Sequence, residues 1–225
     1  MSVNPTYLPV RKDNETIRKT VLTNIVKMLN NRKWISIENV PKQIESLIES
    51  YNDDHVYKIK LDVSLAKVST YDPNDDGTAR EHDKSFEDNV VIIKLLPQKV
   101  TSISKSPIIG EFLTNYKKNH KILVVDSISD KSKHQLMNGK YVEVFNESFL
   151  MIDLFSHVCS PKYEVLTPDE TDEMLKSYHL IRKQMKRMYV TDPAAQYLYL
   201  RRKQVTRIIR HSEIAGLAID YRIII

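Results

Sequence analysis

The chain has 225 residues, of which 41% are hydrophobic and 28% are charged, and its formal net charge is +5 at pH 7. These fractions are those of a globular protein and exclude a disordered one, and the length allows one large domain or two small ones. A single cysteine, Cys159, excludes an internal disulfide and an all-cysteine zinc site within this chain. We find no apolar run near the roughly 20 residues of a membrane span, and no continuous apolar segment of a secretory signal at the N-terminus.

Two helices and a strand are predicted in the first part of the chain. Residues 1–13 carry two prolines and are expected to form an extended arm. Helices are predicted over 14–29 and from about 40 to 51 because apolar residues recur there at helical spacing. Those residues are Ile17, Val21, Ile25 and Met28 in the first helix, and Ile44, Leu47 and Ile48 in the second. Residues 57–65 alternate between apolar and polar, which predicts a strand with one face in solvent.

An acidic segment follows this strand. Residues 72–88 carry seven acids and two bases. Such a composition favours a long solvated loop or insertion, which we place at about 70–88.

The next elements predict a parallel crossover. Residues 90–96 form a nearly continuous apolar run, typical of a strand buried on both faces, and 122–125 form another. A helix is predicted between them, over about 104–118, so the two strands should be parallel. The remaining elements are a short helix over 130–137, a strand over 141–145 and an apolar segment over 148–155.

A linker is predicted at 157–163, and a capping box follows it. Thr167 and Glu170 have the spacing of a helix cap and its reciprocal partner, and Pro168 stands between them. Met174, Leu175 and Tyr178 would form the apolar face of this helix. We therefore expect an N-terminal domain over 1–158 and a C-terminal domain over 159–225.

The basic character of the chain is concentrated near its C-terminus. Residues 181–222 carry ten Lys or Arg and three acids. Asp192 and Pro193 are typical of an N-cap and a first helical position, which predicts a helix over 194–200. Strands are predicted over 204–210 and 218–225, with a connector in which Gly216 permits a positive φ. This unit is too small to bury a good core alone and should need the rest of the chain or a partner.

The same stretch resembles a known family. The run DP-A-A-Q-Y, then RR-K-QV-T-R-IIR-H-SE-I-AG, then YR is similar to the C-terminal assembly domain of the fifth-largest subunit shared by the eukaryotic nuclear RNA polymerases, which has a counterpart in the archaeal enzyme. The residues that agree with the family pattern are Asp192, Pro193, Tyr197, Arg202, Gln204, Val205, Ile208, Ile209, Arg210, Ser212, Glu213, Ala215, Gly216, Tyr221 and Arg222.

The chain departs from the family pattern at four positions. The family usually has glycine where Lys203 stands, proline at His211 and at Lys186, and threonine at Ile214. The lysine puts the turn geometry in question, and the isoleucine removes an interface hydroxyl. The substitutions indicate a divergent member, and the many Ile, Asn and Lys residues leave open that it is virus-encoded.

The N-terminal half resembles the jaw domain of the eukaryotic members in its order of elements. The resemblance implies an overall α+β or α/β architecture: a jaw-type α/β domain with a mixed sheet, followed by a small α+β assembly domain. It also implies that the loop after the second buried strand lies near downstream DNA. Lys131 and Lys133 belong to that neighbourhood.

A nuclease site is a further possibility, because the jaw-type fold carries nuclease activity in other families. That chemistry needs two acids and a lysine on adjacent strands, usually with an acid two positions before the lysine. Lys94 has Ile92 at that position, and Asp62 has no evident partner, so absence of the activity is favoured. The seven histidines show no metal-ligand spacing, and each is expected at the surface or in a linker.

The basic cluster of the C-terminal region allows two interpretations. Its cations could neutralise nucleic-acid phosphates, or they could pair with carboxylates at a protein interface. The resemblance favours the second, because this domain in the family docks on the largest polymerase subunit. The partner-binding residues it implies are Asp192, Pro193, Tyr197, Arg202, Arg210, Ser212, Glu213, Tyr221 and Arg222.

We therefore expect a non-catalytic subunit of a DNA-directed RNA polymerase, with no cofactor, metal or small-molecule substrate and no membrane association. Its partners would be the largest subunit, the rest of the polymerase and, weakly, downstream DNA. It would lie in the nucleus if cellular, and in the cytoplasm or virion if virus-encoded. The alternatives are a stand-alone, sequence-independent nucleic-acid-binding protein and a degenerate nuclease-like domain.

Overall fold

The computed structural model describes residues 13–50, 55–62, 89–103, 106–137 and 141–225. The N-terminal arm and the acidic segment at 70–88 therefore lie outside the described residues. Within the described part, no helix is long and apolar enough to cross a membrane.

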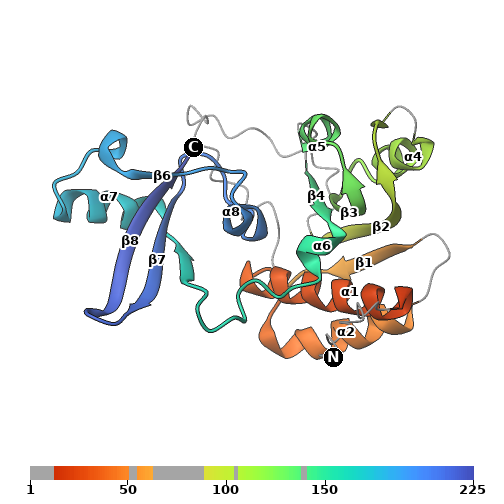
Figure 1. The fold of residues 1–225 in the computed structure, drawn as a ribbon, viewed down its shortest axis with the longest axis horizontal. Helices are drawn as coiled ribbons and strands as arrows, with labels where there is room; N and C mark the ends of the chain where they lie inside the picture. Colours follow the sequence, from red (N-terminus) through yellow and green to blue (C-terminus); the bar gives the residue numbers. More distant parts are fainter. Residues whose placement is uncertain (1–12, 51–54, 63–88, 104–105, 138–140) are drawn as a thin grey trace, which may run out of the picture.

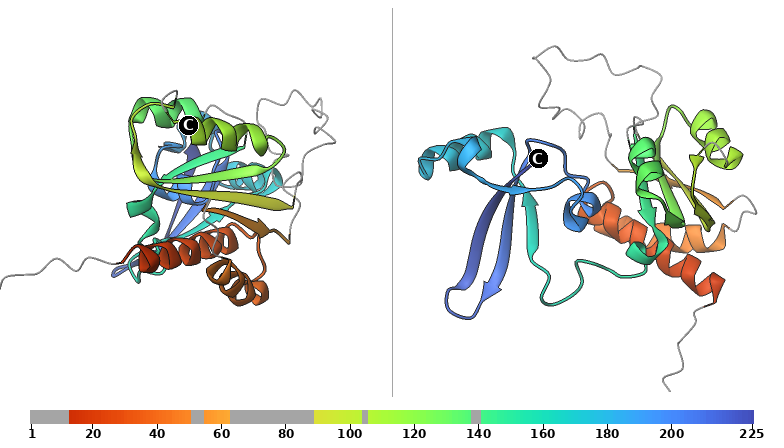
Figure 2. Two further views of the ribbon diagram at one scale, coloured as in Figure 1. Left: turned by 90° about the vertical axis from the view of Figure 1, so that its right-hand side faces the viewer. Right: turned by 45° about the horizontal axis from the view of Figure 1, so that its top comes forward.

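Two helices open the structure and pack against one face of a sheet (Figures 1 and 2). Helix α1 spans Asn14–Asn31 and α2 spans Val40–Glu49, with a 3-10 turn, η1, at Ile37–Asn39 between them. The predicted apolar face of α1 is confirmed, since Val21, Ile25 and Met28 are buried. Helix α2 buries Leu47 and packs Ile44 against the same core.

The first sheet has four strands in the order β1-β2-β3-β4. Strand β1 pairs with β2 antiparallel, and the other two pairings are parallel. The strands are β1 (Val56–Lys60), β2 (Val90–Val100), β3 (His120–Ile128) and β4 (Val142–Asn146). Helix α4 (Pro107–Asn115) connects β2 to β3, so the predicted parallel crossover is confirmed.

Both faces of this sheet are covered, which explains the continuous apolar runs of its central strands. Val91 and Ile93 of β2 belong to the core shared with α1, whereas Ile92 and Leu96 belong to the core shared with α4. Helix α5 (Asp130–Met137) lies on the same side as α4 and has the predicted bounds. The predicted strand at 57–65 is confirmed over β1, where Tyr57 and Ile59 are buried and Lys58 and Lys60 are exposed. The strand ends at Lys60, earlier than predicted, since Leu61 and Asp62 are not part of it, and residues 63–65 lie outside the described residues.

The C-terminal half is built on a second sheet, in the order β5-β7-β8-β6. Strands β7 and β8 form an antiparallel hairpin, β5 pairs antiparallel with β7, and β6 pairs parallel with β8. Helix α6 (Glu147–Leu150) follows β4 and still packs on the first sheet and α1. The elements of the C-terminal half are β5 (Lys162–Val165), α7 (Pro168–Ser177), η3 (Arg182–Gln184), β6 (Lys186–Met188), α8 (Pro193–Tyr197), β7 (Val205–Ser212) and β8 (Gly216–Ile224). The predicted α+β class of the chain and the mixed sheet of its N-terminal part are confirmed.

The local signals read from the sequence are present here. Thr167 Oγ1 accepts a hydrogen bond from the Glu170 amide, and the Glu170 carboxylate accepts one from the Thr167 amide, which completes the capping box. The Asp192 side chain accepts a hydrogen bond from the Ala194 amide and caps α8. Gly216 has a φ of 68° and opens β8. Strand β7 runs on to Ser212, so the predicted connector is shorter than expected.

Candidate partner interface and the junction between the two halves

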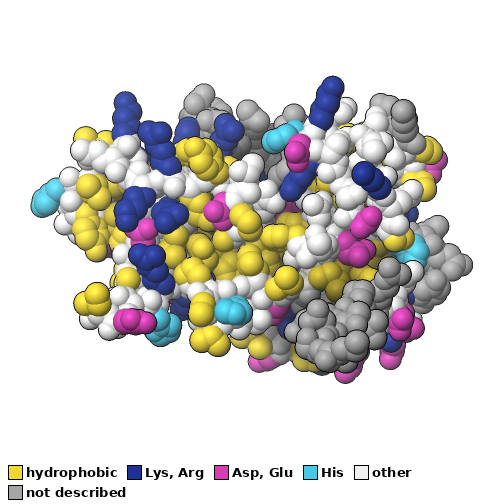
Figure 3. Space-filling model, in the orientation of Figure 1, with side chains coloured by type: hydrophobic (Ala, Val, Ile, Leu, Met, Phe, Trp, Pro, Cys, Tyr) yellow, Lys and Arg dark blue, Asp and Glu magenta, His cyan; other side chains and the backbone are white. Residues whose placement is uncertain are grey.

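The β7–β8 hairpin presents apolar and charged side chains to solvent. Ile214, at its turn, is 100% exposed, and Leu217 and Ile219 are more than half exposed on one face of β8. Glu213 is exposed at the turn, and Arg210 is exposed on the opposite face of the hairpin, because it pairs with Ala218 and not with Leu217 or Ile219. Figure 3 shows apolar, acidic and histidine side chains together over this turn. We call these five residues the hairpin surface. Several exposed apolar side chains on one element mark an interaction site more strongly than scattered ones do.

Three other residues implied by the resemblance form contacts within the hairpin or close to it. Ser212 Oγ accepts a hydrogen bond from the Ala215 amide and so shapes the turn. The Tyr221 ring lies 5.7 Å from that of Tyr178, centroid to centroid. Arg222 donates from Nε to Asp220 at 3.2 Å. These side chains are half-buried, and their main contacts are internal.

Tyr197 is buried within the chain and not at its surface. Its side chain is 2% exposed, and its ring lies 4.6 Å from that of Phe155. Its hydroxyl accepts a hydrogen bond from Asn31 Nδ2 at 3.1 Å. Burial raises the pKa of Tyr197 to about 12, so the hydroxyl keeps its proton. Tyr197 therefore fastens α8 to α1, while Pro193, at the start of α8, is exposed.

The two lysines expected near DNA both lie on α5. Lys131 is exposed. Lys133 is half-buried, and its Nζ donates to Gln196 Oε1 at 3.3 Å. Burial lowers the pKa of Lys133, opposed by the charge of Asp130. Of the two, Lys131 is therefore the one fully available to an outside partner.

A buried ion pair lies where the two halves meet. Arg32, which follows α1, donates to both carboxylate oxygens of Glu143 on β4, each at 2.7 Å. Its Nε also donates to the carbonyl of Tyr197 at 2.7 Å, and Nη2 donates to that of Gln196 at 3.1 Å. A single guanidinium thus connects α1, the first sheet and the C-terminal end of α8. Bidentate pairing of this kind is among the strongest hydrogen-bonding arrangements in proteins.

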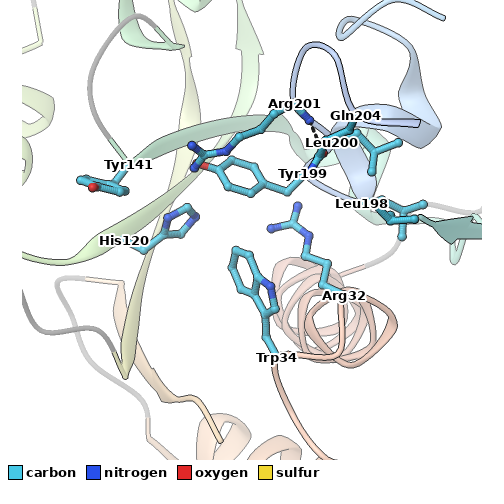
Figure 4. A pocket seen from close by; sticks show the side chains of 10 residues that line it. Arg32, Trp34, His120, Tyr141, Leu198, Tyr199, Leu200, Arg201 and Gln204 are labelled. Atoms are coloured by element: carbon cyan, nitrogen blue, oxygen red, sulfur yellow. Dashed lines mark hydrogen bonds between the residues drawn. The ribbon is translucent and has the colours of Figure 1, made fainter. Parts of the chain in front are cut away.

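His120 belongs to this junction, and the expectation that every histidine lies at the surface or in a linker is wrong for it. Its side chain is 2% exposed, and its Nε2 lies 2.6 Å from Glu143 Oε1. The ring packs edge-on against Trp34 and Tyr199, with centroids 5.3 and 5.2 Å away. Figure 4 shows the Arg32 guanidinium between Trp34 and Tyr199. We call Arg32, Trp34, His120, Glu143 and Tyr199 the junction cluster.

The electrostatics of the junction cluster follow from burial and from Arg32. Burial would by itself raise the pKa of Glu143, but the charge of Arg32 and the hydrogen bond from His120 outweigh it and lower the pKa to about 2. Burial lowers the pKa of His120, with the Glu143 carboxylate acting against it. The imidazole is therefore neutral and donates from Nε2 to an ionised carboxylate.

The junction cluster was not found by sequence reasoning, because its members come from distant segments. One signal was available. Glu143 stands between two valines in the predicted strand over 141–145, and a charge among apolar strand residues usually has a buried partner.

Asp62, the acid considered for a nuclease site, has a local structural role. Its carboxylate accepts hydrogen bonds from the Ser36 amide and hydroxyl and from Asn39 Nδ2, at 2.7 to 3.0 Å. The backbone hydrogen bond from Ser36 is the main cause of its lowered pKa. Lys94 pairs with Val56, at the opposite end of β1. The structure therefore does not bring this acid and this lysine together.

Comparison with known proteins finds relatives along the whole length of the chain. Residues 152–224 match the family model "RNA polymerase Rpb5, C-terminal domain". The chain is 30% identical over 214 residues to "DNA-directed RNA polymerases I, II, and III subunit RPABC1" of Caenorhabditis briggsae, and the alignment covers 93% of this chain and 94% of that protein. It is 27% identical over 230 residues, the full length of both chains, to "DNA-directed RNA polymerase subunit 5" of Acanthamoeba polyphaga mimivirus.

These relatives are all subunits of DNA-directed RNA polymerases, and the match extends through both halves of the chain. The chain belongs to the family of RNA polymerase subunit 5.

Proposed function

We propose that this chain is a non-catalytic subunit of a DNA-directed RNA polymerase that docks on the largest subunit through its C-terminal part, residues 159–225. The observation that carries the proposal is the hairpin surface. It combines three exposed apolar side chains with a cation and an anion, on the region that matches the family model. A polymerase subunit must bind another subunit, and such a mixed surface is typical of protein interfaces.

The remainder of the chain, residues 1–158, would form a jaw near incoming DNA. Exposed lysines such as Lys131 could contact phosphates without reading sequence, which gives weak and salt-dependent binding. The division near residue 158 remains a proposal, and α8 packs across it through Tyr197. The polymerase would be nuclear in a cell, or cytoplasmic or in the virion if the gene is viral.

Co-expression with the largest subunit tests the docking. The tagged chain should retain that subunit on an affinity resin, and Arg210→Ala with Glu213→Ala should reduce its recovery at least roughly tenfold, as loss of paired interface charges does. A matched control is Lys183→Ala with Glu173→Ala, which removes one cation and one anion from exposed positions outside the hairpin. If the hairpin variant still retained the largest subunit and the control variant lost it, the interface would lie elsewhere on the chain. Recovery of nucleic acid alone would favour a stand-alone binding protein.

A further inference from the structure

A cavity of about 830 Å³ lies in the N-terminal half, far in sequence from the hairpin surface. It is lined by the first turns of α1, by the later parts of β2 and β3, and by Glu147 at the start of α6. Figure 1 shows these elements next to one another. Open sheets with parallel strands bind ligands at the carboxyl ends of those strands, in pockets of about 300 to 1,000 Å³. The position and the size of this cavity are therefore those of a binding site.

The walls of the cavity are largely apolar. Val21 of α1 and Val124 of β3 are 1% and 2% exposed and belong to the core beneath it. Ile17 and Leu95 are half-buried, and Pro97 is exposed. These three side chains present apolar surface to solvent at one place, which is typical of a site that another molecule covers.

Two carboxylates of the lining have no cation beside them. Asp126 ends the apolar run of β3, and Glu147 is the first residue of α6. In the part of the chain that the structure describes, neither forms an ion pair. Burial raises the pKa of Glu147, and the negative charge of Asp126 raises it further. A cation placed between these two carboxylates would remove this repulsion.

The other charged groups of the lining leave this demand unmet. Glu15, on α1, pairs with Lys19 one helical turn later, at 2.7 Å. Arg18 also lines the cavity, and its charge acts on Glu15, whose pKa it helps to lower. It is not among the causes that shift the pKa of Glu147.

We propose that this cavity binds an apolar segment of a partner protein that carries lysine or arginine. A few apolar side chains of the segment would enter the cavity and cover Ile17 and Leu95, and its cation would lie against Asp126 and Glu147. Apolar anchors seated in a pocket supply most of the affinity in such recognition, and the charge supplies specificity. The unpaired carboxylates disfavour a nucleic acid, because they would repel its phosphates.

One other occupant has matching chemistry. Residues 1–12 precede Asn14 and Glu15, which line the cavity, and they carry Leu8, Val10, Arg11 and Lys12. The test therefore includes a chain that lacks residues 2–12.

The test uses the full-length chain and a labelled ten-residue peptide of leucine, alanine and lysine, with leucine at helical spacing. Fluorescence anisotropy should show saturable binding, and nuclear magnetic resonance should show shifts of the Ile17 and Leu95 methyl signals. The same peptide with glutamate in place of lysine should bind at least roughly tenfold more weakly, because like charges then face each other. A peptide with alanine in place of leucine should lose binding as well, since it lacks the apolar anchors.

On the protein, Asp126→Asn with Glu147→Gln should weaken binding of the lysine peptide at least roughly tenfold, because both carboxylates are lost without a change of side-chain size. The matched control is Asp169→Asn with Glu173→Gln, at exposed positions of α7, and it should bind like the native chain. Thermal unfolding followed by circular dichroism shows whether both variants are folded. Removing the repulsion between Asp126 and Glu147 should leave the first variant at least as stable as the native chain.

Three results would overturn the proposal. The first is equal binding of the lysine and glutamate peptides, and the second is unchanged binding by a folded Asp126→Asn, Glu147→Gln chain. The third is binding of the lysine peptide only after residues 2–12 are removed, which would assign the cavity to the chain's own N-terminus. Because the assay needs no other polymerase subunit, its outcome is independent of the co-expression experiment.

Discussion

Arg32 and Glu143 lie 111 positions apart in the sequence and form a bidentate ion pair with both nitrogen–oxygen distances at 2.7 Å. The Arg32 side chain is 1% exposed and that of Glu143 is 7% exposed. Removing two charges from water is costly, and the pairing offsets that cost only because the remaining donors of Arg32 reach the carbonyls of α8. The pair therefore fixes the position of α8 relative to the first sheet more than it adds to total stability.

Glu143→Gln should lower the free energy of unfolding by about 3 to 5 kcal/mol, because it leaves the Arg32 charge buried without a counter-ion. Urea unfolding followed by circular dichroism measures this, with Glu111→Gln at an exposed position of α4 as the control. Adding Arg32→Met should recover part of the loss, since no unpaired charge then remains. An unchanged unfolding midpoint for Glu143→Gln would contradict the role assigned to the pair.

The junction cluster should make the protein sensitive to acid. The pKa of Glu143 falls from 4.5 to about 2 on folding, so its contribution is complete above pH 4.5 and is lost as the pH falls through about 2. Since one pKa unit corresponds to about 1.4 kcal/mol, lowering the pKa of Glu143 from 4.5 to about 2 adds about 3 kcal/mol to the free energy of unfolding. His120, whose pKa is lowered from 6.5, acts in the same direction, because below that pH the unfolded chain takes up a proton that the folded chain does not. The free energy of unfolding, measured against pH, should fall below pH 6.5 and fall less steeply for Glu143→Gln between pH 4.5 and 2. If the free energy of unfolding fell equally steeply with pH in the native chain and in Glu143→Gln, Glu143 would not be the source of the acid sensitivity.

Lys203→Gly should stabilise the fold by up to about 1 kcal/mol, because a left-handed conformation is strained for a residue with a Cβ. Lys203 has a φ of 68°, and its amide donates to the Ile224 carbonyl at 2.7 Å. This is the position at which the family usually has glycine. Thermal unfolding measures the change, and Arg202→Gly, next to it and without a positive φ, should give no gain. A Lys203→Gly protein less stable than the native one would show that the lysine side chain outweighs the strain.

Tyr197→Phe should cost about 1 kcal/mol, because it removes the part-buried hydrogen bond that Asn31 Nδ2 donates to the hydroxyl of the buried Tyr197. Tyr189→Phe is the matched control, since Tyr189 is 68% exposed. Chemical denaturation compares the two variants. Equal stability of both would mean that the hydroxyl of Tyr197 contributes nothing at the contact between α1 and α8.

Local signals made the secondary structure largely predictable. The helical spacing in α1, the apolar run of β2 and the capping box of α7 each depend on residues close in sequence. The predicted start of the helix after β2 was too early. That helix, α4, begins at Pro107, because proline is tolerated in the first turn and disfavours helical geometry in the residue before it.

The junction cluster could not be predicted in the same way. His120, Glu143 and Arg32 carry no spacing signal, and their meeting depends on how β3, β4 and α1 pack. Similarly, Tyr197 matched the family pattern, but only its position in the fold shows that its side chain is used inside the chain. The hairpin residues Arg210 and Glu213 were named from the resemblance, and their exposure is what keeps them available to a partner.

The most direct test of the central claim is a gentle affinity isolation of the tagged, full-length chain from its native source, followed by mass spectrometry. We expect the two large polymerase subunits to be recovered in near-stoichiometric amounts, and Arg210→Ala with Glu213→Ala to remove them. Recovery of the native chain alone, or with DNA only, would contradict its assignment as a polymerase subunit.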